Sequence, residues 1–385
     1  TGDRERQLAD IEAMQRYAEQ ISPIKMANVA LRRASFSEAV SDYEAMIEAA
    51  KFAIECVSDD GPAAILARSY LEWGIAQERT GDYAAAHEQL QRALALAKEA
   101  EDRPLAGLAL RGLGIVARAV RRHALAYDYY KEALAQFIEL GDLNAQASTL
   151  VWLGVLSTDL GDIARARSYY EEALELSRVT GYRYQESFAL SNLGSNANYQ
   201  GDYERATRFI KQALDVSRQI DNRIVECLCL NNLGTVKVNQ DDYEEALANY
   251  EQSLAIALDT GHRSMEASAA TGVGHALIML GRPVEALDAL QEGLRVRREL
   301  EEVHLHETLV LLAYGYLKMG NAERAREVVA ETLDYLDEDG RFYITEFGLR
   351  NYVYLIDVLE AVEDARAGTV LRRAHAELEE EAERI

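Results

Sequence analysis

Residues 193–206 read LGSNANYQGDYERA, and residues 233–246, 40 positions later, read LGTVKVNQDDYEEA. The same spacing runs through most of the chain, because a glycine recurs every 40 residues and an alanine follows it twelve residues later. A seventh unit is one residue shorter and has Ala313 in place of the glycine. A repeat of this length indicates a solenoid, in which each unit packs against its neighbours. The glycines are Gly74, Gly114, Gly154, Gly194, Gly234 and Gly274, and the alanines are Ala86, Ala126, Ala166, Ala206, Ala246 and Ala286.

The repeated glycine is predicted to lie in the middle of a helix, since the apolar residues of each unit follow the helical period. A glycine in a helix interior costs about 1 kcal/mol relative to alanine. Its recurrence therefore predicts that a second helix approaches closely at this point. We expect the alanine twelve residues later to be the small residue that faces the glycine.

A turn signal follows most of these glycines seven residues later, as in Gly201-Asp202-Tyr203. Glycine suits the left-handed conformation that ends a helix, and aspartate is a favoured N-cap of the next one. We therefore expect two helices per unit, joined by a tight turn. The unit at 103–140 departs from the pattern, because Arg121-Arg122-His123 stands at its turn.

These features resemble the tetratricopeptide (TPR) repeat in a 40-residue form, and the resemblance is strong over residues 61–338. It implies an all-α fold, a right-handed superhelical solenoid of antiparallel helix pairs. We expect an N-terminal capping helix and a degenerate first repeat in residues 1–60, seven TPR-like repeats in 61–338, and a C-terminal helix pair in 339–385, all in one continuous solenoid. The chain has only 4 prolines in 385 residues and no Pro/Gly/Ser-rich linker, as such a fold requires.

The chain carries a formal net charge of −24. An acidic surface repels phosphate, so we expect neither a nucleic-acid partner nor an anionic membrane surface; alternatively, the charge only keeps the protein soluble. We find no signal peptide and no apolar run of about 18 residues, the length that would span a membrane. Three cysteines, Cys56, Cys227 and Cys229, fit neither a disulfide framework nor a zinc site, which favours a reducing, cytoplasmic location.

The sequence contains no motif of an enzyme active site. The phosphate-binding loop motif and the metalloprotease His-Glu-x-x-His motif are absent. Gly112-Leu113-Gly114 and Gly272-Val273-Gly274 are predicted inside helices, where the backbone N–H groups are already bonded and cannot hold phosphate. We therefore expect no catalytic activity, no cofactor and no metal.

The resemblance implies that the first helix of each pair lines a concave groove. Counted with the glycine at position 8, positions 2, 5, 6, 9, 12 and 13 face this groove in TPR proteins. In the fourth and fifth units they carry many amides and hydroxyls, which can both donate to and accept from a peptide backbone or sugar hydroxyls. The candidate ligand-binding residues are Arg111, Arg118, Trp152, Phe188, Ser191, Asn192, Ser195, Asn198, Tyr199, Asn231, Asn232, Thr235, Asn239 and His275.

Other interpretations of these positions stay open. The amides and hydroxyls could simply tolerate a wet helix surface, and Trp152 suits either packing between helices or stacking on a ligand. The apolar strip of the seventh unit, which includes Val310 and Tyr314, is expected to pack under the C-terminal helices. Arginines at the start of several first helices have a glutamate three residues later, as in Arg183 and Glu186, which predicts a structural ion pair.

Two families of binding protein compete as models for the function. The C-terminal segment, with residues 349–359, 364–367 and 381–385, resembles the end of the TPR sensor domain of bacterial STAND signalling ATPases and ATPase-linked transcriptional regulators. That resemblance implies a protein or small-molecule effector in the groove and an NTPase domain in the same full-length protein. The chain opens without methionine, which fits a piece of such a protein.

The alternative is a stand-alone adaptor that binds peptides, similar to the Partner-of-Inscuteable group. The stretches 191–194 and 231–234 resemble the repeat cores of those proteins. In that group an arginine at position 2 accompanies the groove asparagine, whereas this chain has Phe188 and Leu228 there.

Overall fold

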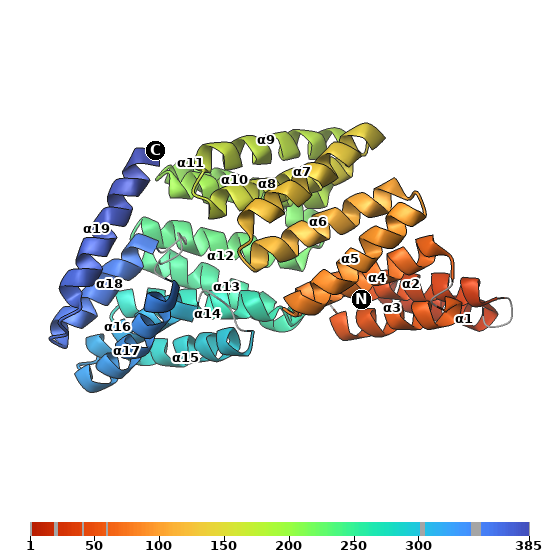
Figure 1. Cartoon of the computed structure of the whole chain (residues 1–385). Helices are drawn as coiled ribbons and strands as arrows, with labels where there is room; N and C mark the ends of the chain where they lie inside the picture. Colours follow the sequence, from red (N-terminus) through yellow and green to blue (C-terminus); the bar gives the residue numbers. More distant parts are fainter. Residues whose placement is uncertain are drawn as a thin grey trace. The chain divides into compact units, whose positions relative to one another are not determined.

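The computed structural model describes residues 2–18, 22–40, 42–58, 61–300, 305–339 and 348–384. In these ranges the chain forms 19 α-helices and no strand (Figure 1). From α4 to α15, short turns join consecutive helices. The predicted all-α fold of paired helices is therefore confirmed. The helices are α1 (Gly2–Ala18), α2 (Pro23–Ala39), α3 (Tyr43–Val57), α4 (Ala63–Arg79), α5 (Tyr83–Glu99), α6 (Arg103–Ala119), α7 (His123–Leu140), α8 (Leu143–Asp159), α9 (Ile163–Thr180), α10 (Arg183–Tyr199), α11 (Tyr203–Gln219), α12 (Arg223–Asn239), α13 (Tyr243–Thr260), α14 (Arg263–Met279), α15 (Pro283–Glu299), α16 (Leu305–Lys318), α17 (Ala322–Asp339), α18 (Gly348–Ala361) and α19 (Ala367–Arg384).

The chain divides into two compact units, Thr1–Leu156 and Ser157–Ile385. Helices α4 to α17 lie in the range predicted to hold seven repeats, and the division into repeats, with its boundaries at 60/61 and 338/339, stays a prediction. The side chains of residues 349 and 381–385, which carry part of the resemblance at the C-terminus, lie outside the described residues.

The repeated glycines lie where two helices of a pair come closest. A Cβ atom on Gly74 would lie 2.7 Å from Cγ of Leu90, and one on Gly234 would lie 2.7 Å from Cε1 of Tyr250. The predicted close approach is confirmed, but the side chain that needs the space comes sixteen residues after the glycine. The alanine at twelve residues, such as Ala86, is fully buried one turn earlier in the second helix.

A second glycine explains the Gly-x-Gly stretches. A Cβ on Gly112 would lie 2.9 Å from Cδ2 of Leu90, so Leu90 packs between Gly74 of α4 and Gly112 of α6. Tyr250 packs in the same way against glycines of α12 and α14. These glycines therefore accommodate large side chains of the second helices, in agreement with the expectation that they do not form a phosphate loop.

The turns between paired helices have the predicted geometry. Gly201 has a φ of +73°, and Oδ1 of Asp202 accepts a hydrogen bond from the backbone N–H of Arg205 at 3.0 Å. The divergent turn keeps the same conformation, because Arg121 has a φ of +62°. The side chain of Arg122, however, makes no capping hydrogen bond at the start of α7.

The predicted ion pairs at the start of the first helices are structural. The carboxylate of Glu186 is buried and binds Arg183 at 2.5 Å within α10 and Arg178 of the preceding α9 at 3.2 Å. Glu226 makes the equivalent pairs with Arg223 and Arg218. Each buried carboxylate thus joins a first helix to the second helix before it.

Replacing Gly194 with alanine should destabilise the fold. The added Cβ would clash with Cγ1 of Ile210 and would lie 3.2 Å from the carbonyl oxygen of Ala206. Overpacking of this kind costs about 1–3 kcal/mol, which exceeds the gain of about 1 kcal/mol in helix propensity. We expect a lower thermal unfolding midpoint by circular dichroism. Gly368→Ala is the matched control, because its Cβ would meet only Arg372 at 3.6 Å; an equal loss in both variants would contradict the packing argument.

Replacing Arg122 with aspartate should stabilise the chain by about 1 kcal/mol, because α7 would gain the N-cap that Asp82 gives α5 and Asp202 gives α11. Chemical denaturation measures the change. Arg122→Ala removes the same arginine without adding an acceptor and should give a smaller effect. If the alanine and aspartate variants unfold at the same denaturant concentration, the missing N-cap of α7 does not lower the stability of the chain.

Candidate functional site

Polar side chains of α10 and α12 form hydrogen bonds directly between these two neighbouring first helices. Nδ2 of Asn232 donates to Oγ of Ser191 at 3.1 Å and to Oγ of Ser195 at 2.9 Å. Nδ2 of Asn239 donates to Oδ1 of Asn198 at 3.1 Å. We call these five residues the polar ladder. Several amides that the sequence suggested for a ligand therefore hold consecutive helices together.

Burial divides the fourteen predicted groove residues into two groups. One group is buried and not open to a ligand in this structure: Ser191, Asn198, Asn232, Thr235 and His275. The other group is partly exposed: Arg111, Arg118, Trp152, Phe188, Asn192, Ser195, Tyr199, Asn231 and Asn239. In this structure only residues of the second group are open to a ligand, and their role in ligand binding stays a prediction.

The exposed polar groups next to the ladder keep capacity for further hydrogen bonds. Nδ2 of Asn192 donates to the backbone carbonyl of Phe188 at 2.8 Å, while the ring of Phe188 stacks on Tyr184 with centroids 6.4 Å apart. Oδ1 of Asn231 is enclosed and accepts no hydrogen bond. This oxygen is therefore not itself open to a ligand, although Asn231 as a residue is partly exposed.

In the compact unit Thr1–Leu156, the structure brings together two of the predicted ligand-binding residues. The guanidinium carbon of Arg118 on α6 lies 5.6 Å from the ring centroid of Trp152 on α8, within the range of a cation–π interaction. Arg111 lies on the same helix as Arg118 and is half-buried. The Arg118–Trp152 contact favours the interpretation of Trp152 as a residue that packs between helices.

Helix α18 covers the predicted groove position on α14. Nε2 of His275 lies 2.9 Å from the hydroxyl of Tyr354, and the Tyr354 ring stacks on Tyr314 of α16 with centroids 4.6 Å apart. Arg350, one turn earlier in α18, reaches Oδ1 of Asp241 at 3.4 Å. His275 is therefore a buried contact of the C-terminal helices and not an open ligand contact.

The apolar strip on α16 packs as expected. Val310 and Tyr314 are buried in one core cluster with Tyr354 and Leu355 of α18. Sequence reasoning found this packing from composition. It missed the contact between α18 and α14, although Tyr354 follows His275 by 79 positions, which is the length of one 40-residue unit and the shorter seventh unit.

Burial has electrostatic consequences at this contact. Burial, and to a smaller extent the charge of Arg350, lowers the pKa of His275 from 6.5 to about 3. Burial also raises the pKa of Tyr354 to about 12, against the opposing effect of Arg350. The imidazole and the phenol are therefore both neutral near pH 7, which suits a hydrogen bond inside a core.

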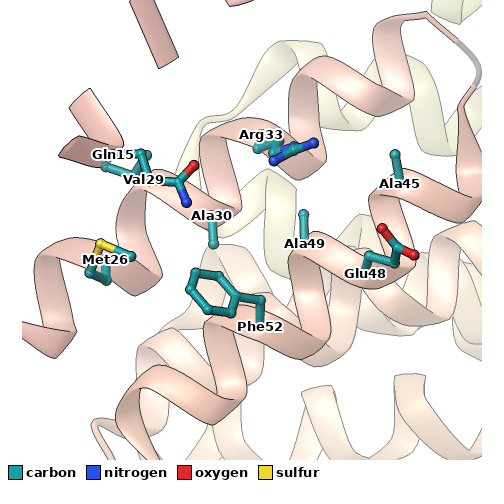
Figure 2. A pocket seen from close by; sticks show the side chains of 9 residues that line it. All are labelled: Gln15, Met26, Val29, Ala30, Arg33, Ala45, Glu48, Ala49 and Phe52. Atoms are coloured by element: carbon teal, nitrogen blue, oxygen red, sulfur yellow. The ribbon is translucent and has the colours of Figure 1, made fainter. Parts of the chain in front are cut away.

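Two cavities lie among the first helices of the compact unit Thr1–Leu156. One, of about 250 Å³, lies between α1, α2 and α3; Figure 2 shows Met26, Ala30 and Phe52 at one end and Ala45 and Glu48 at the other. The second, of about 880 Å³, lies between α1, α2 and the start of α4. The sequence analysis predicted neither cavity, although the basic residues along α2, such as Lys25 and Arg32, could have indicated the larger one.

Every helix in the described ranges is too short or too polar to span a bilayer. In the same residues, no group of three His, Cys, Asp or Glu side chains is arranged to hold a metal ion.

The fold of paired helices with a 40-residue period defines a TPR protein. Residues 65–139 match the tetratricopeptide repeat, and residues 149–377 match the MalT-like TPR region. The second match spans more than half of the chain, so the chain belongs to the family of the MalT-like TPR region. No curated protein matches the sequence.

Solved structures show the same fold at low sequence identity. A Rap protein complexed with Competence and Sporulation Factor is 16% identical, with a TM-score of 0.67, over 93% of this chain and 99% of that chain. NprR in complex with its cognate peptide NprX is 16% identical, with a TM-score of 0.56, over 91% of this chain and 98% of that one. A STAND protein with a TPR sensor from Pyrococcus horikoshii is also 16% identical, with a TM-score of 0.57, over 91% of this chain but only 52% of that chain.

Acid should weaken the docking of α18 on α14. Because the pKa of His275 is lowered on folding, the unfolded state binds a proton first as the pH falls below about 6.5. The stability contributed by neutral His275 is thus fully present above pH 6.5 and is lost towards pH 3, by on the order of 2 kcal/mol at pH 5. Denaturant unfolding at pH 7.5 and pH 5 measures this loss.

The variant His275→Gln, whose amide does not titrate, should show a smaller difference between the two pH values than the unmodified chain. The same change at the exposed His375 of α19 is the control for removing a histidine elsewhere. A pH dependence that is equal in the unmodified chain and in His275→Gln would show that this group does not control the acid response.

Proposed function

We propose that this chain is a ligand-binding TPR module that recognises an extended peptide or a small-molecule effector on the exposed first-helix surface of α10 and α12. The observation that carries the proposal is the partly exposed side-chain amide of Asn192 beside the polar ladder, whose recorded hydrogen bond goes only to the backbone of its own helix. The ladder fixes the separation of the two helices, while Asn192, Tyr199 and Asn231 stay partly exposed. Amides that donate and accept suit a peptide backbone.

The structural neighbours support a peptide as the ligand. The Rap protein and NprR were each solved with a bound factor or cognate peptide, and both share this fold over more than 90% of the chain. By contrast, the adaptor mode of the Partner-of-Inscuteable type is disfavoured. Phe188 occupies the place of its arginine and stacks on Tyr184.

We further propose that the module is the sensor, and the autoinhibitory part, of a multidomain signalling ATPase. Membership of the MalT-like TPR family and the fold shared with the STAND sensor protein support this. Regulation then requires that the ligand binds the active and inactive states of the full-length protein with different affinity. A gene whose complete reading frame encodes no NTPase domain would overturn this part, without affecting ligand binding by the helices. No catalytic step is assigned to the chain itself.

The double variant Asn192→Ala/Asn231→Ala should weaken peptide binding at least about tenfold, since two hydrogen bonds to the ligand are lost. A library of random heptapeptides selected on the purified chain supplies the probe, and fluorescence anisotropy measures the affinity of the selected peptide. The thermal midpoint of the variant should stay close to that of the unmodified chain, because neither side chain belongs to the ladder.

Asn249→Ala is a matched control. Asn249 lies on the second helix α13 and donates to the carbonyl of Glu245 at 2.7 Å, as Asn192 does to the carbonyl of Phe188 on the first helix α10. Loss of affinity in the control, or none in the double variant, would place the ligand elsewhere. Selection of no peptide from the library would exclude a peptide ligand.

A further inference from the structure

Three aromatic side chains form an exposed row at the start of α10. The ring of Tyr182 lies 6.1 Å from that of Tyr184, and the ring of Tyr184 lies 6.4 Å from that of Phe188, measured between centroids. Tyr182 is 36% exposed and Tyr184 is 39% exposed. We call these three residues the aromatic row. Exposed rings of this kind favour contact with another aromatic or large apolar group.

The aromatic row takes the place of a helix cap. Asp102 precedes α6, Asn222 precedes α12 and His262 precedes α14, and each side chain accepts a hydrogen bond from the first turn of its helix. Tyr182 stands at the same position of α10 and makes no capping hydrogen bond. Because a capping side chain stabilises a helix, the stability of the solenoid does not explain a tyrosine here. Such departures from local rules are expected at functional sites.

The apolar residues continue on α12 and on no other neighbouring first helix. Ile224 is 36% exposed and Leu228 is partly buried, and they stand 40 residues after Tyr184 and Phe188. The same two positions hold polar residues one unit earlier and one unit later, namely Asn144 with Ser148 and Ser264 with Ser268. The repeat therefore does not require apolar residues at these positions, and they are confined to the two helices that share the polar ladder.

This apolar surface adjoins the proposed ligand site. Phe188 lies one helical turn before Asn192, and Leu228 lies one turn before Asn232. The hydrogen bonds of the polar ladder hold α10 and α12 next to each other in parallel, so both apolar pairs lie at the same end of the two helices. A ligand that binds Asn192 can thus also reach the aromatic row.

Arginines outnumber carboxylates in the ion pairs at the start of both helices. Arg178 and Arg183 bind one and the same buried carboxylate, that of Glu186, and both arginines stay partly exposed. The equivalent group on α12 also has two arginines for one carboxylate. Each group of ion pairs thus has one positive charge in excess, in a chain whose net charge is −24. Arg183 stands between Tyr182 and Tyr184 in the sequence, so this charge favours a ligand with an acidic group beside its apolar one.

We propose that the aromatic row, together with Ile224 and Leu228, binds an aromatic side chain of the peptide ligand, and that a carboxylate next to this side chain binds the arginines at the start of α10. This inference rests on the proposed peptide binding by α10 and α12, and it specifies the ligand as a peptide with an aromatic residue beside a carboxylate. The carboxylate is that of an aspartate or glutamate side chain or that of the C-terminus of the peptide. Because the arginines are exposed, the affinity falls as salt rises.

The peptides selected from the random heptapeptide library on the unmodified chain test the proposal first. They should share an aromatic residue beside an acidic one, or an aromatic residue at the C-terminus. In the peptide that binds best, alanine in place of the aromatic residue should weaken binding at least about tenfold by fluorescence anisotropy. Amidation of the C-terminus, and separately an amide in place of the acidic side chain, shows which carboxylate the arginines bind.

Tyr184→Ser/Phe188→Ser tests the aromatic row from the side of the protein. Serine is the residue that α14 has at both positions, so the variant uses a combination that the repeat already accommodates. It should weaken the selected peptide about tenfold, but it should not further weaken the peptide whose aromatic residue is alanine, because the two changes remove the same contact. Tyr127→Ser on α7 is the control, since Tyr127 is also 36% exposed and should leave binding unchanged.

Tyr182→Asn separates ligand binding from a structural role of the row. Asparagine caps α12 at the same position, so the variant should raise the thermal midpoint of the chain and yet weaken the selected peptide at least about threefold. If the row served only the packing of the solenoid, the variant would instead lower the midpoint and leave the affinity unchanged.

Selected peptides that lack an aromatic residue, or that bind Tyr184→Ser/Phe188→Ser as tightly as the unmodified chain, would overturn this inference. If such peptides still lose affinity in Asn192→Ala/Asn231→Ala, the proposed peptide site stands and the aromatic row has no part in it. Affinity that is unchanged after both carboxylates are removed would overturn the ionic contact. A library that yields no peptide would overturn both this inference and the proposed peptide ligand.

Discussion

The close approach of helices at the repeated glycines sets the spacing of the whole structure. In five of the helix pairs, a large side chain of the second helix, such as Leu90 or Tyr250, fills the space that a glycine leaves on the first helix of its own pair. Leu90 and Tyr250 also pack against a glycine of the next first helix. Leu90, between Gly74 and Gly112, shows how one such side chain sets the separation of two consecutive first helices. Between α10 and α12, the separation places Asn232 within 3.1 Å of Ser191 and Ser195. The polar ladder is therefore a consequence of the packing that the glycines permit.

The same repeat position carries different residue types in different units, and these have different roles on the first-helix surface. Position 6 of the first helix is Gly112 on α6 and Gly272 on α14, where it receives a large side chain from the pair before. The same position is Asn192 on α10 and Asn232 on α12. Asn232 satisfies its amide with two hydroxyls of the neighbouring helix, whereas Asn192 bonds only its own helix and stays partly exposed. One packing position thus serves helix spacing in one unit and leaves a polar group for a ligand in the next.

The repeat pattern predicted the fold well because it depends on local features. Three features define the repeat: the helical periodicity of apolar residues, the mid-helix glycine and an N-cap aspartate such as Asp202. Each can be recognised within about 40 residues of sequence, and each recurs in several units. The candidate site was harder to predict, because the exposure of a side chain depends on whether another helix packs over it. His275 occupies a groove position by register, yet Tyr354 covers it from α18, which is not the next first helix after α14 but the one after that. The polar ladder likewise depends on the distance between α10 and α12, which no single repeat specifies.

The ends of a solenoid obey a different constraint from its interior. Every interior helix pair buries one face on the pair before it and one on the pair after it. A terminal pair leaves one face open to solvent, and this face has to be polar for the protein to stay soluble. Helices α1 to α3 precede both family matches, and α19 extends beyond them, so repeat packing does not account for their composition. In the described residues, α19 exposes Leu371 and Leu378, and Lys25 and Arg32 of α2 line a cavity together with Asp10. Exposed apolar area offers no stability to an isolated chain, so these leucines do not contribute to the packing of α19 on α18.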